Sequence, residues 1–261
     1  MVVSGRKMHE DAPVGVAGAT RRLTGQRDPD QVLADRYLHD LYSTAYGALG
    51  QLVATAPRGP VLEIGAGTGL ARSLGHHWIA SDVVCSPEMG LLADARSLPL
   101  ADTSVSALVL KDALLHIPDV DRFLDEADRV LIDGGVIAVF DPYWGPLARF
   151  VYRHLHHEPY DDRSTSWSFT AASPRDSNQA ASYLMLERDR ERLASRWPRL
   201  TVEQREPLVG PSFLISGGVS RRTAVSGRLL AGLLRWEQRR GHWFDALRFF
   251  HVFALRKRAE Q

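Results

Sequence analysis

Apolar residues recur at three- and four-residue spacing from Pro29 to about Pro57, a pattern that predicts one or two amphipathic helices over residues 29–56. Residues 1–28 show no such periodicity and are rich in Gly, Pro, Arg and Asp, so we expect a flexible leader there. Beyond residue 57, short apolar runs alternate with helical stretches. That alternation is typical of an α/β domain whose mostly parallel sheet carries helices on both faces.

The short apolar runs predict seven strands. In chain order they are residues 61–64, 78–81, 89–93, 106–110, 136–140, 200–208 and 249–255. Helices are predicted at 120–131, 186–197 and about 222–247, with a turn at 133–135. Only about a dozen residues separate Asp82 from Asp94, so we expect the helix between the second and third strands to be lost or shortened. Residues 143–185 and 210–247 interrupt the pattern and are interpreted as cap segments of one domain over 57–261.

The composition is that of a globular protein. The chain has 261 residues, 44% of them hydrophobic, and a formal net charge of +1, so nothing in the overall charge demands nucleic acid as a partner. No apolar run reaches the ~18 to 20 residues of a membrane span, and the first residues do not form a signal peptide. The single cysteine, Cys85, fits a reducing compartment. We therefore expect a cytoplasmic protein with no integral membrane association.

The most specific motif is GPVLEIGAGTGL, in which an apolar strand leads into Gly65, Gly67 and Gly69. A glycine-rich turn after a strand lets a ligand approach the backbone closely. A dinucleotide-binding turn would read G-x-G-x-x-G, but Leu70 stands where the third glycine belongs. Glu63 places a carboxylate just before the turn, which would repel a pyrophosphate and attract an ammonium group.

An acid, Asp82, follows the second predicted strand at nearly the spacing of an acid that binds a ribose. With VLEIGAGTG, this acid, ADARSLPLADTSVSALVLKDALLHIPD and RVLIDGG, the segment from about 61 to 141 resembles the class I S-adenosylmethionine-dependent methyltransferases, and more closely their type-11 branch. The resemblance implies a Rossmann-like, seven-stranded, mostly parallel sheet with N-terminal helices and cap insertions after the fifth and sixth strands. It also implies S-adenosylmethionine as cofactor and S-adenosylhomocysteine as product.

By the same resemblance, the glycine turn surrounds the methionine part of the cofactor, and the acid after the second strand bonds the ribose hydroxyls. The Asp-Ala pair after the third strand lies at the adenine edge. The lysine that ends the fourth strand offers its backbone carbonyl to the cofactor's ammonium. The cofactor residues implied are Glu63, Gly65, Ala66, Gly67, Asp82, Asp94, Ala95 and Lys111.

The acceptor chemistry has weaker signals. His116 follows the fourth strand, and an imidazole can take a proton near neutral pH, so it is the first choice as a general base; Asp141 is an alternative. The 143–185 segment leaves the sheet on the side where ligands bind and supplies aromatic and polar side chains. The predicted substrate-binding residues are Trp144, His156, His157 and Glu158, the last two being further candidates for the base. We expect no metal site, because two adjacent histidines cannot easily face one ion.

These observations predict methyl transfer to a small-molecule or glycan acceptor, with a hydroxyl oxygen favoured. The downstream segments resemble family members of polysaccharide and natural-product pathways. Two alternatives stay open: a non-methylating enzyme on the same fold, and a cofactor-binding pseudo-enzyme.

Arginines outnumber acidic residues from Thr201 onward. We expect the apolar positions of the 222–247 stretch to be mainly buried, with weak association with a lipid surface as the alternative. The oligomeric state is left open.

Overall fold

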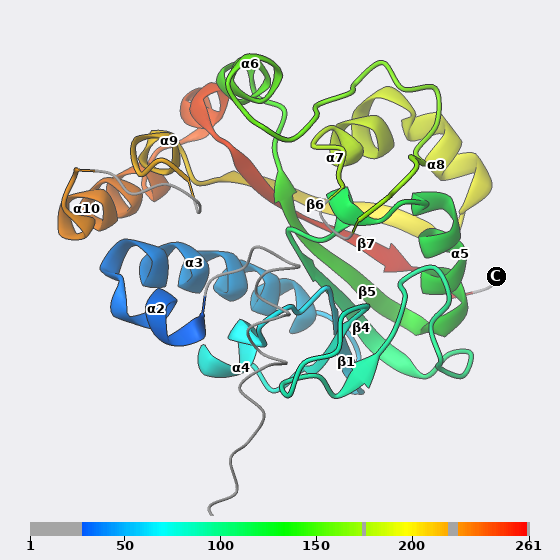
Figure 1. The fold of residues 1–261 in the computed structure, drawn as a ribbon. Helices are drawn as coiled ribbons and strands as arrows, with labels where there is room; N and C mark the ends of the chain where they lie inside the picture. Colours follow the sequence, from blue (N-terminus) through cyan, green and yellow to red (C-terminus); the bar gives the residue numbers. More distant parts are fainter. Residues whose placement is uncertain (1–27, 174–175, 219–223, 260–261) are drawn as a thin grey trace, which may run out of the picture.

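The computed structural model describes residues 28–173, 176–218 and 224–259, so of the predicted leader only Asp28 lies within the described part. A seven-stranded sheet in the order β3-β2-β1-β4-β5-β7-β6 forms its centre (Figure 1). Its strands are β1 (Val61–Ile64), β2 (Ile79–Asp82), β3 (Leu91–Leu92), β4 (Val105–Lys111), β5 (Leu131–Pro142), β6 (Leu200–Leu208) and β7 (Phe250–Lys257). The first five pair in parallel, and β7 runs antiparallel to β5 and β6. The predicted Rossmann-like, mostly parallel sheet is confirmed.

Helices cover both faces of the sheet, because successive strand residues point to opposite sides and both sides are apolar. On β5, Ile137 and Val139 belong to one core cluster, whereas Ala138 and Phe140 belong to the other. The first cluster is covered by α5 (Val120–Val130), α7 (Ala181–Tyr183), the π-helical turn η2 (Leu184–Arg188) and α8 (Arg190–Arg196). The second is covered by α2 (Pro29–Ala34), α3 (Arg36–Val53), α4 (Leu70–Ser73), α6 (Pro146–His154) and α10 (Gly227–Gln238).

Helix α3 is the longer of the two N-terminal helices, which lie within the predicted 29–56 stretch. The side chain of Asp35 caps it by accepting hydrogen bonds from the amides of Tyr37 and Leu38, at 2.9 and 3.0 Å. The buried face of α3 includes Tyr42 and Tyr46. This helix therefore brings two phenol rings to the second face of the sheet.

The connection from β2 to β3 contains no helix, as the short spacing predicts. Two predicted boundaries are wrong, however. The third strand, expected over 89–93, is only Leu91–Leu92. The predicted turn at 133–135 lies inside β5, where the pairing with β4 jumps from Val105↔Leu131 to Ala107↔Val136. Gly134 has a φ of 79°, so the backbone can loop out there without ending the strand.

The helical predictions after residue 185 need a similar correction. The 186–197 stretch begins as the π-helical turn η2 before α8. The 222–247 stretch breaks after α10 and resumes as the 3₁₀ helix η3 (His242–Leu247); its first two residues lie outside the described part.

The segments that follow β5 and β6 leave the sheet at the same end of the strands. Phe250 of β7 pairs with both Pro142, the last residue of β5, and Leu208, the last residue of β6. No helix among the described residues is long and apolar enough to cross a membrane.

Candidate active site

The glycine turn connects β1 to α4. Gly65, Gly67 and Gly69 have φ angles of 71°, 56° and 70°, a left-handed conformation that side chains disfavour. A Cβ on Gly65 would also lie 2.9 Å from the Cβ of Ala113, just after β4. Glycine at this position therefore lets the turn pass close to the carboxyl end of the neighbouring strand.

Asp82, the last residue of β2, holds this turn in place. Its Oδ2 accepts a hydrogen bond from the Gly67 amide at 2.9 Å, and its Oδ1 accepts one from the Val84 amide at 3.0 Å. A carboxylate has about four acceptor positions, so two of them are still available to a ligand. Asp82 is 7% exposed, and the surface it keeps faces a cavity.

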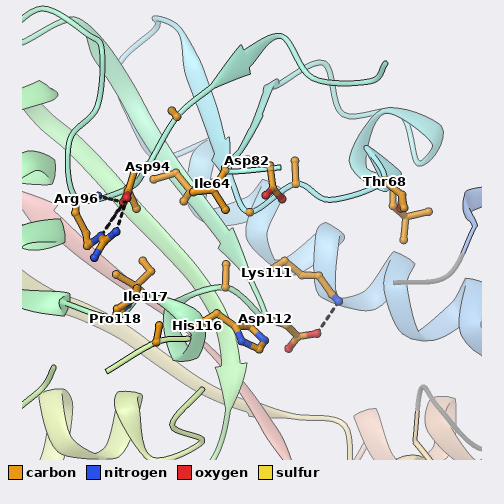
Figure 2. Close-up of a pocket in the computed structure, with 18 of the residues that line it drawn as sticks. Ile64, Thr68, Asp82, Asp94, Arg96, Lys111, Asp112, His116, Ile117 and Pro118 are labelled. Carbon is orange, nitrogen blue, oxygen red and sulfur yellow. Dashed lines mark hydrogen bonds and ion pairs between the residues drawn. The ribbon is translucent and has the colours of Figure 1, made fainter. Parts of the chain in front are cut away.

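That first cavity has a volume of about 570 Å³, within the range of small-molecule sites. Figure 2 shows Asp82 and Asp94 on one side of it and Asp112 and His116 on the other. Among the residues predicted from sequence, it is lined by Gly65, Ala66, Asp82, Asp94, Ala95, Lys111, His116 and Glu158. Glu63 and Gly67 lie next to this lining without forming part of it. The structure thus brings together most of the predicted cofactor set.

Asp94 is paired with Arg96, which the sequence analysis missed. The Arg96 side chain donates from Nε to Oδ1 of Asp94 at 2.9 Å and from Nη2 to Oδ2 at 2.6 Å. These bonds lower the pKa of the Asp94 carboxyl. Arg96 also lines the first cavity, and a planar guanidinium is suited to lie against an aromatic ligand.

Glu63 lies beneath the turn and does not reach the cavity directly. It is buried, and its Oε1 accepts a hydrogen bond from the hydroxyl of Tyr46, a cavity-lining residue, at 2.8 Å. Burial raises the pKa of Glu63 to about 7, although the Tyr46 bond and the nearby Lys111 oppose the rise. Tyr46 therefore stands between the cavity and the Glu63 carboxylate, which the sequence predicts to attract an ammonium group.

Replacing Glu63 with Gln should stabilise the protein above neutral pH, because the amide still accepts the Tyr46 bond and carries no charge into the interior. The folded carboxyl keeps its proton up to about pH 7, whereas the unfolded one releases it near 4.5. The wild type therefore loses stability as the pH rises between these values. A shift of this size corresponds to about 3 kcal/mol of unfolding free energy, gained by the variant at alkaline pH and absent at acidic pH.

Urea unfolding on both sides of this pH window measures the difference. Glu191→Gln, at an exposed position of α8, is the control and should leave the pH dependence unchanged. An equal pH dependence in wild type and Glu63→Gln would show that the Glu63 carboxyl titrates alike in the folded and unfolded chains.

Lys111 and Asp112 form an ion pair at the end of β4, with Nζ 2.6 Å from Oδ2. The Lys111 ammonium also lies over the Tyr42 ring, 4.2 Å from its centroid. Burial alone would lower the pKa of Lys111, but Asp112, Tyr42 and Glu63 together outweigh it and the pKa rises. Asp112 has a φ of 50°, a strained conformation for a residue other than glycine, and such residues concentrate at functional sites. The sequence analysis missed it, although it follows its strand as Asp82 follows β2.

His116 ends the 3₁₀ helix η1 (Leu114–His116) and is half-buried. Its Nδ1 lies 3.1 Å from the backbone carbonyl oxygen of Asp176. Because a carbonyl oxygen only accepts, Nδ1 carries the proton of the neutral ring. Nε2 is then the proton-accepting nitrogen, as a general base requires.

A second cavity, of about 1140 Å³, adjoins the first. Its lining includes apolar side chains such as Val151, Phe213 and Phe249 and polar ones such as Asn178 and Gln179. Three side chains line both cavities: Asp112, His116 and Glu158. These three residues therefore form the boundary between the two cavities.

The predicted substrate-binding residues separate into two groups. His156, His157 and Glu158 line the second cavity, with the rings of the two histidines stacked 4.6 Å apart. Burial lowers the pKa of His156. Trp144 lines neither cavity, because its indole packs among Tyr183, His251 and Arg205. Its placement gives no support to a contact with the acceptor.

Asp141, the alternative base, is fully buried and lines neither cavity. Ser182 donates a hydrogen bond to its Oδ2 at 3.0 Å. Burial, followed by the charge of Asp112, raises the pKa of Asp141 well above its usual value. No group of three His, Cys, Asp or Glu side chains within 28–173, 176–218 and 224–259 is arranged to hold a metal ion.

Comparison with known proteins gives one family match. Residues 62–139 match the family model described as a methyltransferase domain. This segment contains the glycine turn, Asp82, Asp94, Lys111 and His116. No curated protein sequence matches the chain.

Solved structures are similar to this chain at low sequence identity. A chain in the complex between the Haloferax volcanii Trm112 methyltransferase activator and a methyltransferase is 17% identical, with a TM-score of 0.50 and coverage of 94% of this chain and 96% of that one. The YcgJ protein from Bacillus subtilis is 17% identical over 83% and 100% of the two chains, with a TM-score of 0.48. The geranyl diphosphate C-methyltransferase from Streptomyces coelicolor A3(2) is 15% identical over 91% and 87%, with the same score.

Proposed function

We propose that this chain, whose residues 62–139 match a methyltransferase-domain model, is a class I S-adenosylmethionine-dependent methyltransferase that methylates an organic acceptor bound in the second cavity. The observation that carries the proposal is the junction of the two cavities at Asp112, His116 and Glu158. Methyl transfer needs donor and acceptor in line and in contact, and alignment supplies much of its rate. Two adjoining cavities of suitable size meet that need.

The first cavity fits S-adenosylmethionine, which is a cation at its sulfur and its ammonium. Asp82, Asp94 and Asp112 place carboxylates around the cavity, and the two cations that line it, Lys111 and Arg96, are each paired with one of these acids. Because the carboxylates outnumber the cations, the cavity lining attracts a positively charged ligand. When bound, the cofactor supplies a methyl carbon activated by the positive sulfur.

The residues around this cavity take separate binding roles in our proposal. The backbone at Gly65 and Ala66 receives the methionine part, and Asp82 accepts hydrogen bonds from the ribose hydroxyls. Asp94 and Ala95 border the adenine, with the Arg96 guanidinium beside it. Tyr46, backed by Glu63, faces the ammonium together with the backbone carbonyl of Lys111. These groups belong to different elements, which the parallel sheet brings to one edge.

At the junction, His116 acts on the acceptor. Its Nε2 takes the proton of an acceptor hydroxyl, while the Asp176 carbonyl holds the ring through Nδ1. Asp112 and Glu158 lie on the same boundary and are the alternative proton acceptors. Their carboxylates also stabilise positive charge where the two ligands meet.

We propose a hydroxylated organic molecule as the acceptor. The lining of the second cavity combines apolar rings with amide, hydroxyl and imidazole groups, which suits a molecule with both apolar and polar surface. We assign to His156 and His157 the role of forming hydrogen bonds with the acceptor. A small-molecule or glycan acceptor is consistent with this lining, and a cytoplasmic location with the single cysteine, Cys85.

Incubation with S-adenosylmethionine carrying a CD₃ group tests the function. Purified protein mixed with a metabolite extract from its source should give products with the added label and release S-adenosylhomocysteine in equal amount, detected by mass spectrometry. Heat-denatured protein is the control. Tight cofactor binding with no labelled product from the extract would favour a pseudo-enzyme or a non-methylating enzyme.

A further inference from the structure

Helix α10 has two unlike apolar faces. Leu230, Ala231 and Leu234 are buried against the core, as the sequence analysis expected for the whole stretch. Leu229 is 69% exposed and Trp236 44% exposed, and in η3 Trp243 is 70% exposed. The expectation of mainly buried apolar positions therefore holds for one face of the helix and is wrong for the other.

The exposed residues form one surface. The rings of Trp236 and Trp243 both contact Phe244, with centroids 5.7 and 5.5 Å away. Leu229 precedes Trp236 by two turns of the same helix, so both lie on one face. We call the surface of Leu229, Trp236 and Trp243 the tryptophan patch. Isolated exposed apolar residues need no explanation, but two exposed indoles that contact the same phenylalanine ring, with an exposed leucine on the helix face of one of them, indicate an interaction surface.

The surroundings of the tryptophan patch are positively charged. Arg228 and Arg239 are exposed, and the Arg240 guanidinium lies over the Trp236 ring, 4.0 Å from its centroid. The acids of the same segment do not offset them at the surface: Glu237 is fully buried, and Asp245 is only partly exposed. Arginines that flank indole and leucine side chains are complementary to anionic headgroups above an apolar layer.

Hydrogen bonds connect the helix of the tryptophan patch to an element that lines the second cavity. Glu237, on the inner face of α10, accepts hydrogen bonds from the amides of Gly210 and Ser212 at the start of α9 (Pro211–Ile215), at 3.0 and 2.6 Å. Phe213 and Leu214 of α9 line the second cavity, and Leu214 is also partly exposed. Figure 1 shows α9 and α10 together at one end of the molecule. A surface that binds the tryptophan patch would therefore lie close to this cavity wall.

We infer that the tryptophan patch binds the surface of an anionic lipid membrane, and that the acceptor is an amphiphile presented from it. The second part rests on the proposed function, whereas the first does not. Indoles insert at the boundary between headgroups and acyl chains, while arginines contact the phosphates. Apolar side chains that line the second cavity would contact the acyl part of the acceptor, and its polar side chains would contact the hydroxylated head.

Vesicle co-sedimentation tests membrane binding. The purified full chain is mixed with vesicles of phosphatidylcholine alone or with added phosphatidylglycerol. We expect binding to the anionic vesicles that weakens as salt is raised, and a loss of about tenfold or more in the partition coefficient for the double variant Trp236→Ser, Trp243→Ser. Leu92→Ser, at an apolar position 60% exposed on the far edge strand β3, is the matched control and should bind as the wild type does.

Three results would overturn the inference: no binding of the wild type to anionic vesicles, full binding by the double variant, or an equal loss in Leu92→Ser. Dimerisation without lipid that the double variant abolishes would assign the tryptophan patch to a second copy of the chain instead. Circular dichroism establishes that each variant is folded. Calorimetry with S-adenosylmethionine, performed without vesicles, reports on the proposed function separately, so the failure of one does not imply the failure of the other.

Discussion

Replacing His116 with Asn lowers turnover by about 10²- to 10⁴-fold and leaves the affinity for S-adenosylmethionine unchanged. The asparagine is similar in size and can still donate to the Asp176 carbonyl, but it has no nitrogen that can accept a proton. His116 is the residue of the junction whose hydrogen bond leaves a ring nitrogen free for this purpose. Turnover is measured with the identified acceptor across pH, and cofactor affinity by calorimetry.

His154→Asn, at an exposed position of α6, is the matched control and should have wild-type turnover. A much smaller loss in the His116 variant would mean that positioning dominates the rate, because bringing the oxygen, the methyl carbon and the sulfur into line does not require a base. Near-normal turnover at every pH would show that His116 is not the base, without contradicting the proposed methyl transfer. Asp112 and Glu158 would then be the next positions to replace.

Asp82→Ala weakens S-adenosylmethionine binding by about 1.5 to 3 kcal/mol, or roughly ten- to 150-fold. The variant loses the carboxylate that we assign to the ribose hydroxyls. It also frees the Gly67 amide, which Asp82 holds at 2.9 Å, so the glycine turn becomes less ordered before the ligand arrives. Both effects act on affinity, and calorimetry measures their sum.

Asp102→Ala, which removes an exposed carboxylate outside both cavities, is the control and should bind the cofactor normally. Circular dichroism and thermal unfolding report whether Asp82→Ala is folded. Unchanged affinity in a folded variant would exclude Asp82 from the cofactor site.

Local sequence determines much of the fold and part of the candidate site. The strand before Gly65 and the acid after β2 could be predicted because they follow directly from an apolar run and the turn that ends it. Parallel strands then bring Asp82, Asp94 and Lys111 to one edge. The same logic predicted the lost helix before β3, since a short spacing leaves no room for one.

The remaining features depend on packing between distant segments, which no local pattern records. Tyr46 reaches the first cavity from α3, and only the tertiary structure places it between Glu63 and the ligand space. Trp144 looked like part of the acceptor pocket because it is aromatic and follows β5, yet its indole turns toward His251 of β7. The exposed face of α10 was only the alternative to burial, because apolar residues cover both sides of that helix and periodicity does not tell which side has a partner.

A crystal structure with bound S-adenosylhomocysteine would locate the cofactor site. The product should lie in the first cavity, with its ribose hydroxyls on Asp82 and its sulfur facing the boundary formed by Asp112, His116 and Glu158. The second cavity would then open onto the sulfur. A product bound outside the first cavity, or bound there with its sulfur turned away from these three residues, would contradict the account.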